Sequence, residues 1–260
     1  MNSTPLDSLP LGLLFVVVCV LSCLVLEGGY RLGRWRHARS SEEKETPVGA
    51  MVAAILALFA FMLAFTFGMA ADRFEKRRQT ILDESNAIGT TYLRARLLAE
   101  PQRAESTRLL REYVDVRIRA ASDGKILDAK SRSEQLHELL WAQAVASADK
   151  SRDPVTGLYI ESLNQMIDMH GVRVHVGLRN RIPVIIWGGL FALAGMSMAS
   201  VGYQSGLSAT RRSPAMGVLV VAFSSVILLI ADLDRPMEGL IVVGQEAMID
   251  LQSSMKTGSP

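Results

Sequence analysis

The sequence predicts an all-α membrane protein with four transmembrane helices and a helical extramembrane domain between the second and the third. Four apolar blocks contain no internal charged residue or histidine, and about 20 such residues cross a bilayer core. The polar stretch between the middle blocks keeps a helical spacing of apolar residues, without long strand-like alternation. A net charge of only +2 gives no reason to expect a nucleic-acid partner. The four blocks are Leu9–Leu26, Val48–Ala71, Ile182–Ser200 and Met216–Ala231.

The first block is expected to remain as a membrane span rather than to be removed as a signal peptide. It is long, no Lys or Arg precedes it, and it shows no small-residue cleavage site. Cys19 and Cys23 share one face of this helix, and we interpret them as buried small apolar side chains. Gly28-Gly29 is expected to end the span. The arginines that follow favour a topology signal at the headgroups, with binding of anionic lipid or a partner as the alternative: Arg31, Arg34, Arg36 and Arg39.

The second block begins a helix that is predicted to continue out of the membrane. Its first 24 residues, Val48–Ala71, are uncharged, and no helix breaker separates them from the amphipathic stretch that follows. Thr46-Pro47 is expected to start this helix and Pro101 to end it, because proline fits a first turn and disrupts an interior. The result is one rod from Val48 to about Leu98 that joins the membrane part to the polar domain.

Small residues recur at intervals of three and four in the second and third spans. This spacing places each set on one stripe, where helices can approach closely within lipid. The stripes are Ala53, Ala57, Ala60, Ala64, Gly68 and Ala71, and Gly188, Ala192, Gly195, Ala199 and Gly202. Larger apolar residues occupy other faces of the second span and are candidates for a gate that excludes water, although ordinary packing is the commoner reason for such residues. They are Phe59, Met62, Phe65, Phe67 and Met69.

The domain between spans two and three is predicted to be helical throughout. Gln102–Ala121 repeats apolar residues at helical spacing, and the turn residues 122–125 follow it. Ser133 is expected to cap a second helix, and Asp153-Pro154 to open a third. The predicted boundaries are residues 1–71 for the first two spans and their connector, 72–181 for the domain, 182–231 for the last two spans, and 232–260 for a C-terminal segment. The fourth block is short and needs Pro214 or Leu233 to complete its crossing.

Motifs for chemistry are not found in the sequence. The four histidines lack metal-ligand spacing, and there is no phosphate loop, nucleophile elbow or dinucleotide fingerprint. The spans also lack the ionisable groups that ion-coupled pumps place at membrane depth. We therefore expect no enzyme activity, no cofactor and no metal.

Three segments resemble a bestrophin-like family of four-span membrane proteins. They are GMAADRFEKRRQTILDESNAIGTTYLRARLL, LREYVDVRI and LDRPMEGLIVV, with Leu140-Trp141 between the last two. The match covers nearly the whole chain. Residues of these motifs with no assigned role are Glu84, Asn86, Asp232, Asp234, Arg235, Pro236 and Gly239.

The resemblance implies the layout of bestrophins, with oligomeric assembly around a central pore and an apolar neck lined by the second span. The neck would correspond to Phe59–Met69 in this chain. The acidic calcium clasp that bestrophins carry after the fourth span is not evident, since Asp232 and Asp234 are followed by Arg235 and Pro236.

The function expected on these grounds is passive conduction of small ions by a homo-oligomer, a pentamer being one form to consider, with an apolar gate in span two. Basic residues beyond the gate favour anions slightly: Arg73, Lys76, Arg77 and Arg78. The alternative is a non-conducting scaffold or sensor whose helical domain binds a partner protein. The expected location is a cell membrane, a bacterial inner membrane, with the domain on the cytoplasmic side. Basic residues near the span ends number eight on one side and seven on the other, so charge does not decide this orientation.

Overall fold

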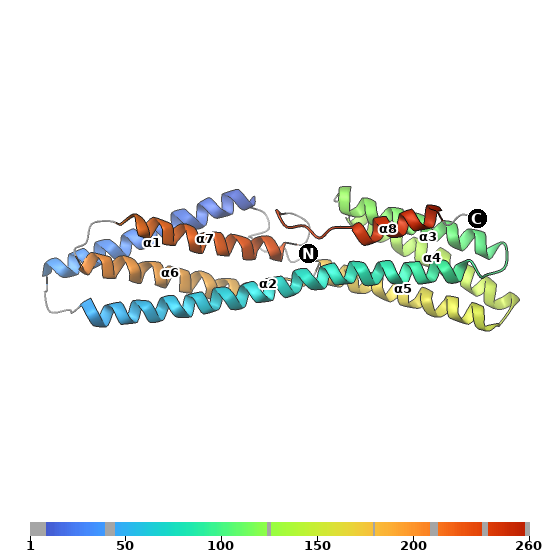
Figure 1. The fold of residues 1–260 in the computed structure, drawn as a ribbon, viewed down its shortest axis with the longest axis horizontal. Coiled ribbons are helices and arrows are strands. Elements are labelled where there is room, and N and C mark those ends of the chain that lie inside the picture. The colour runs from blue at the N-terminus through green and yellow to red at the C-terminus, as the bar shows by residue number, and fades with distance from the viewer. Residues whose placement is uncertain are drawn as a thin grey trace. The chain divides into compact units, whose positions relative to one another are not determined.

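The structure is a computed structural model that describes residues 9–39, 45–123, 126–178, 180–208, 213–235 and 239–257. Within these ranges every regular element is an α-helix, and this confirms the all-α prediction (Figure 1). The chain divides into two compact units, Met1–Arg73 with Arg181–Ile241, and Phe74–Asn180 with Val242–Pro260. The long helix α2 (Glu45–Ala95) runs without interruption and contributes residues to both units.

The first unit contains four helices that are long and apolar enough to cross a membrane. They are α1 (Leu11–Arg39), the first part of α2, α6 (Val184–Leu207) and α7 (Pro214–Asp234). The last of these begins with Pro214 and includes Leu233, as its crossing requires. The side-chain oxygen of Ser213 accepts a hydrogen bond from the amide of Ala215 at 3.3 Å and caps this helix.

Helices α1 and α6 approach each other closely through glycines. A Cβ atom placed on Gly202 would lie 2.0 Å from the carbonyl oxygen of Leu26, and one on Gly206 would lie 2.3 Å from that of Tyr30. From the other side, a Cβ atom placed on Gly29 would lie 2.1 Å from the carbonyl oxygen of Ala199. These are the small residues at four-residue spacing that let helix backbones pack in lipid. The third-span stripe therefore packs partly against α1.

Helix α1 continues beyond the predicted end of the span at Gly28-Gly29 and reaches Arg39, and Gly29 permits the close approach to α6. The expectation that both cysteines are buried is wrong. Cys23 is exposed within the chain rather than buried, and Cys19 is half-buried. Both cysteines are free thiols.

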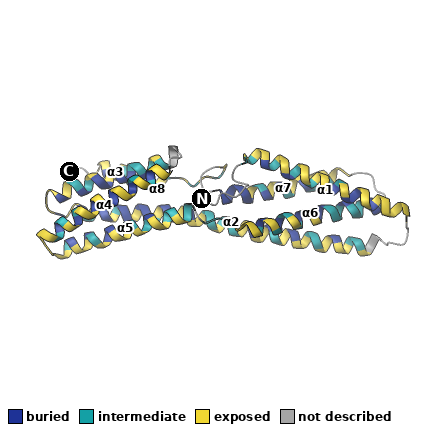
Figure 2. Cartoon of the chain, turned by 180° about the vertical axis from the view of Figure 1, so that it is seen from behind, coloured by how far each residue is buried: buried dark blue, intermediate teal, exposed yellow. Residues whose placement is uncertain are grey.

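The second unit is a helical bundle with one continuous apolar core. The remainder of α2 packs with α3 (Gln102–Asp123), α4 (Ile126–Lys150), α5 (Pro154–Leu178) and α8 (Glu246–Thr257). Figure 2 shows buried residues on the inner faces of these helices and exposed residues on their outer faces. The largest fully buried side chains in this core include Ile88, Leu110, Tyr113, Leu140, Tyr159 and Met166.

Helix boundaries in the second unit partly follow the sequence signals. Asp153 caps α5 as predicted, because its Oδ1 accepts a hydrogen bond from the amide of Thr156 at 2.8 Å. Ser133 is not a cap: α4 begins at Ile126, and Ser133 lies buried inside it. Helix α2 ends at Ala95, before Pro101 is reached. The predicted turn residues Gly124 and Lys125 lie outside the described residues.

Helix α8 returns the end of the chain to the second unit. The side chain of Gln252 donates to Asp115 of α3 at 2.6 Å, and Ser85 of α2 donates to the carbonyl of Ala247 at 2.9 Å. Met248 and Met255 are buried in the core. Helix α8 is therefore part of the bundle, whereas the sequence predicts only a C-terminal segment over residues 232–260.

Candidate functional site

The residues suggested as a gate divide into inward and outward positions on α2. Phe59 is fully buried, and its ring lies 4.8 Å from that of Phe223 on α7, so it packs within one chain. Met62 and Met69 are half-buried. Phe65 and Phe67 are exposed, at 55% and 37%. Phe59 thus packs inside the chain, whereas Phe65 and Phe67 point away from it.

Phe61 and Phe65 form the most prominent exposed aromatic pair of α2. Phe61 is 67% exposed, and the two residues lie one turn apart on the same side of the helix. Gly68 continues this side towards the second unit, and a Cβ atom there would meet nothing within 4 Å. From Phe61 to Gly68 this side is apolar and exposed within the chain, and Asp72, one turn further, is its first charged residue.

The four basic residues after the span also differ in exposure. Lys76 and Arg78 are exposed, and Arg78 lies 3.7 Å from Glu75. Arg73 is half-buried and donates to the carbonyl of Met69 at 3.3 Å. Arg77 is buried.

Glu84 lies at the centre of a buried polar cluster in the second unit. Its carboxylate is fully buried and forms an ion pair with Arg117 of α3, whose Nε lies 3.1 Å from it. It also accepts hydrogen bonds from a guanidinium nitrogen of Arg173 of α5 and from the hydroxyl of Tyr113 at 3.0 Å. Arg173 also donates to Gln245, just before α8, at 2.9 Å. One carboxylate therefore ties three helices and the segment leading into α8. Asn86, two residues on, is exposed and takes no part.

Two histidines complete this cluster. His170 of α5 lies 3.1 Å from the hydroxyl of Tyr113 through its Nδ1, and its ring packs edge-on against His137 of α4 with centroids 4.9 Å apart. Burial and the nearby charge of Arg117 lower the pKa of both histidines to about 4. Both rings are therefore neutral at pH 7. They lie 33 residues apart on different helices, so sequence spacing could not bring them together.

The histidine pair should make the second unit sensitive to acid. Between pH 6.5 and 4 the unfolded chain binds protons at His137 and His170 while the folded chain does not, so stability should fall as the pH falls through this interval. The expected loss is about 1 kcal/mol per histidine per pH unit. Denaturant unfolding at a series of pH values measures it. His137→Phe, which keeps a buried ring, should flatten the dependence, whereas the same slope in this variant and in the exposed control His175→Gln would contradict the assignment.

Two backbone amides of the segment after the fourth span contact Asp232 at the end of α7. The buried carboxylate of Asp232 accepts hydrogen bonds from the amides of Leu240 at 2.9 Å and Ile241 at 3.1 Å. Gly239 has a φ of +153°, and a Cβ atom on it would lie 2.0 Å from Oδ1 of Asp232. Only glycine fits this position. Pro236 lies outside the described residues.

The neighbouring motif residues join the ends of three membrane helices. Oδ1 of Asp234 accepts a hydrogen bond from the amide of Ile182, before α6, at 3.0 Å, and Arg235 donates to the carbonyl of Leu9, before α1. Asp232 and Asp234 thus serve different backbone donors. Among the described residues there is no group of three or more histidines, cysteines or acidic residues placed to hold a metal.

Comparison with known proteins agrees with this architecture. The chain is similar to the crystal structure of a bacterial bestrophin homologue from Klebsiella pneumoniae that carries one substitution, with a TM-score of 0.70 and 13% identity over 96% of this chain and 99% of that one. It is also similar to the crystal structure of a membrane protein, with a TM-score of 0.66 and 14% identity over the same shares of the two chains. A comparison with curated proteins gives no significant match.

The family is shown by the sequence itself. A family model described as a bestrophin-like domain matches residues 14–248, which include nearly all of the four membrane helices and the helices α3 to α5 between them. The four apolar helices and this match together make the chain a multi-pass membrane protein. The chain belongs to the bestrophin-like family.

Proposed function

We propose that the protein is a homo-oligomeric channel that conducts small ions passively, with an apolar gate formed by α2. The observation that carries this proposal is the exposed pair Phe61 and Phe65, on a side of α2 that is uncharged from Phe61 to Gly68. Repeated around an axis, such a pair would form rings that exclude water in the closed state. We propose Phe61 rather than Phe59 as the partner of Phe65 in the gate, because Phe59 packs against Phe223 within one chain.

Assembly of several copies is supported by the small residues of the second span. Ala57, Ala60, Ala64 and Gly68 are all exposed in the single chain. Small side chains on a membrane helix allow the backbones of neighbouring subunits to approach closely. A pentamer is the form that the family resemblance favours.

Anion preference follows from the charges beyond the gate. The segment Asp72–Arg78 contains four basic and two acidic residues; Lys76 and Arg78 are exposed, and so are Asp72 and Glu75. A net positive mouth raises the local concentration of anions. Reversal potentials in a chloride gradient measure this preference.

We place the protein in a bacterial inner membrane with the second unit on the cytoplasmic side. Asp149 of α4 is exposed and lies outside the membrane helices. In a chain without Cys19 and Cys23, Asp149→Cys therefore gives a single cysteine whose labelling reports the side of the second unit. An impermeant maleimide should label it only after the cells are opened. Labelling in intact cells would reverse the orientation.

The gate proposal predicts opposite outcomes for two phenylalanines. Phe65→Ala should increase chloride efflux from liposomes, because it widens and wets the constriction without disturbing the bundle. Phe59→Ala, the matched control, should instead lower stability by about 3–5 kcal/mol through loss of buried packing, without a larger flux per folded protein. Equal fluxes of wild type, Phe65→Ala and Phe61→Ala would contradict a gate on this side of α2.

A scaffold or sensor remains the second candidate function because α4 has an exposed apolar side. Trp141 is 39% exposed and Val145, one turn further, is 48% exposed. Such a pair is typical of a helix that contacts another protein. Loss of a co-purifying partner in Trp141→Ser, combined with absence of any flux, would favour this candidate over a channel.

A further inference from the structure

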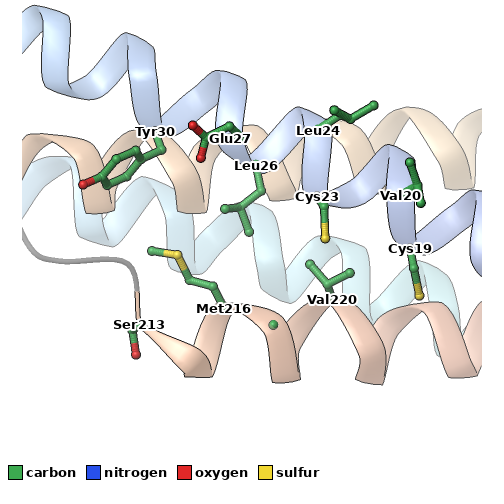
Figure 3. A pocket seen from close by; sticks show the side chains of 11 residues that line it. Cys19, Val20, Cys23, Leu24, Leu26, Glu27, Tyr30, Ser213, Met216 and Val220 are labelled. Atoms are coloured by element: carbon green, nitrogen blue, oxygen red, sulfur yellow. The ribbon is translucent and has the colours of Figure 1, made fainter.

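An apolar groove lies between α1 and α7 within the first unit. Its volume is about 510 Å³, and its walls are almost entirely carbon and sulfur. The thiols of Cys19 and Cys23 point from α1 towards α7, where Met216 and Val220 form the opposite wall (Figure 3). Polar groups are confined to one end, at Glu27, Tyr30 and Ser213.

The length of the groove matches one leaflet of a bilayer. Its lining runs along α1 from Cys19 to Tyr30, which at 1.5 Å per residue is about 16 Å, or roughly half of a ~30 Å hydrocarbon core. An unfilled apolar groove of this size would forfeit dispersion contacts along both helices. A single lipid chain supplies such contacts in a membrane.

The polar end of the groove continues into a basic surface. Val20, Leu24, Glu27, Arg31 and Arg34 recur at intervals of three and four, so they share one side of α1. Both arginines are exposed, and Nε of Arg31 lies 2.8 Å from the Glu27 carboxylate, which balances that acidic charge.

The residues beyond the groove have the character of a headgroup region. The guanidinium of Arg39 lies 4.2 Å from the ring centroid of Trp35, which is 50% exposed. Tryptophan and arginine together are typical of the membrane–water interface. With Arg36, this end of α1 carries four arginines against one acidic residue.

We propose that the groove binds one acyl chain of an anionic phospholipid, with the lipid phosphate held by Arg31 and Arg34. The apolar length accepts the chain, and the guanidinium groups recognise the phosphate through charge-assisted hydrogen bonds. The occupancy of the groove does not depend on whether the protein conducts ions.

The test uses the purified full-length protein in detergent with added phosphatidylglycerol or phosphatidylcholine of the same chain length. Native mass spectrometry counts bound lipids, and the rate at which a maleimide labels Cys23 reports occupancy of the groove. Phosphatidylglycerol should bind about tenfold more tightly than phosphatidylcholine and slow the labelling accordingly. Arg31→Gln combined with Arg34→Gln should remove this difference and leave the weaker binding.

A second variant tests the groove itself. Gly217 lines it, and a Cβ atom there would meet nothing within 4 Å, so Gly217→Leu should fill the groove without displacing the backbone. It should abolish the bound lipid, while Gly188→Leu, also in open space but outside the groove, should not. Equal affinity for the two lipids, or undiminished binding by Gly217→Leu, would overturn the proposal. Disulfide cross-linking between copies through Cys23 would show that a second subunit covers the groove instead.

Discussion

Replacing Glu84 with alanine should destabilise the second unit more than any other single change of charge. The variant would leave Arg117 and Arg173 without their shared carboxylate in a place where water cannot replace it. Breaking a buried ion pair in this way costs about 3–5 kcal/mol, a large share of the ~5–15 kcal/mol that stabilises a typical domain. Thermal unfolding of the full-length protein in detergent measures the loss.

Two control variants distinguish the effect of breaking a buried ion pair from the effect of removing any acidic side chain. Glu105 pairs with Arg108 at 2.6 Å but both side chains are largely exposed, so Glu105→Ala should cost at most about 1 kcal/mol. Glu84→Gln keeps a hydrogen-bond acceptor but not the charge and should fall between the two. If Glu84→Ala were no less stable than Glu105→Ala, the cluster would not be the element that ties the helices of this unit together.

Adding one methyl group at Gly202 should disrupt the packing of α1 on α6. A Cβ atom there would lie 2.0 Å from the carbonyl oxygen of Leu26, and a backbone atom cannot move aside as a side chain can. Gly202→Ala should therefore force the two helices apart, and overpacking of this kind costs about 1–3 kcal/mol or more. Size-exclusion chromatography and thermal unfolding in detergent report the effect.

Gly195 provides the matched control on the same helix. A Cβ atom at this position would meet nothing within 4 Å, so Gly195→Ala should be as stable as the wild type. Indistinguishable melting temperatures for the two variants would show that α1 and α6 can separate without loss, contrary to the packing described above.

The membrane helices could be predicted because their signal is local. An uncharged run such as Val48–Ala71 is enough to identify a span, and the lack of a helix breaker after it predicts the unbroken α2. The third-span stripe was also found, but its partner on α1 was not. Gly28-Gly29 marks only the expected end of the first span, and its sequence does not reveal that Gly29 permits close packing of α1 on α6.

The polar cluster could not be predicted because its members are distant in the sequence. Glu84 lies 33 residues before Arg117 and 89 before Arg173, and only the packing of α2, α3 and α5 brings them together. Burial was the missing information, since a solvated Glu84 on a helix face would look the same in the sequence. Asp232 and Gly239 are closer together in the sequence, but their spacing does not reveal that the Asp232 carboxylate accepts hydrogen bonds from the amides of Leu240 and Ile241.

The exposure of individual phenylalanines on α2 could not be predicted from the sequence either. Phe59 and Phe65 both lie in the apolar run of α2, yet one contacts Phe223 and the other faces away from its own chain. Helical periodicity alone does not say which side of a membrane helix contacts lipid, a neighbouring helix or a pore, since all three can be apolar.

Electrical recording from the purified wild-type protein in a planar lipid bilayer tests the central proposal most directly. A passive channel should give stepwise currents in symmetrical chloride that need no added cofactor and no ion gradient coupled to transport, and that grow in the Phe65→Ala variant. Silent bilayers with folded protein present, for the wild type and for the Phe61→Ala and Phe65→Ala variants alike, would contradict ion conduction through an apolar gate on α2.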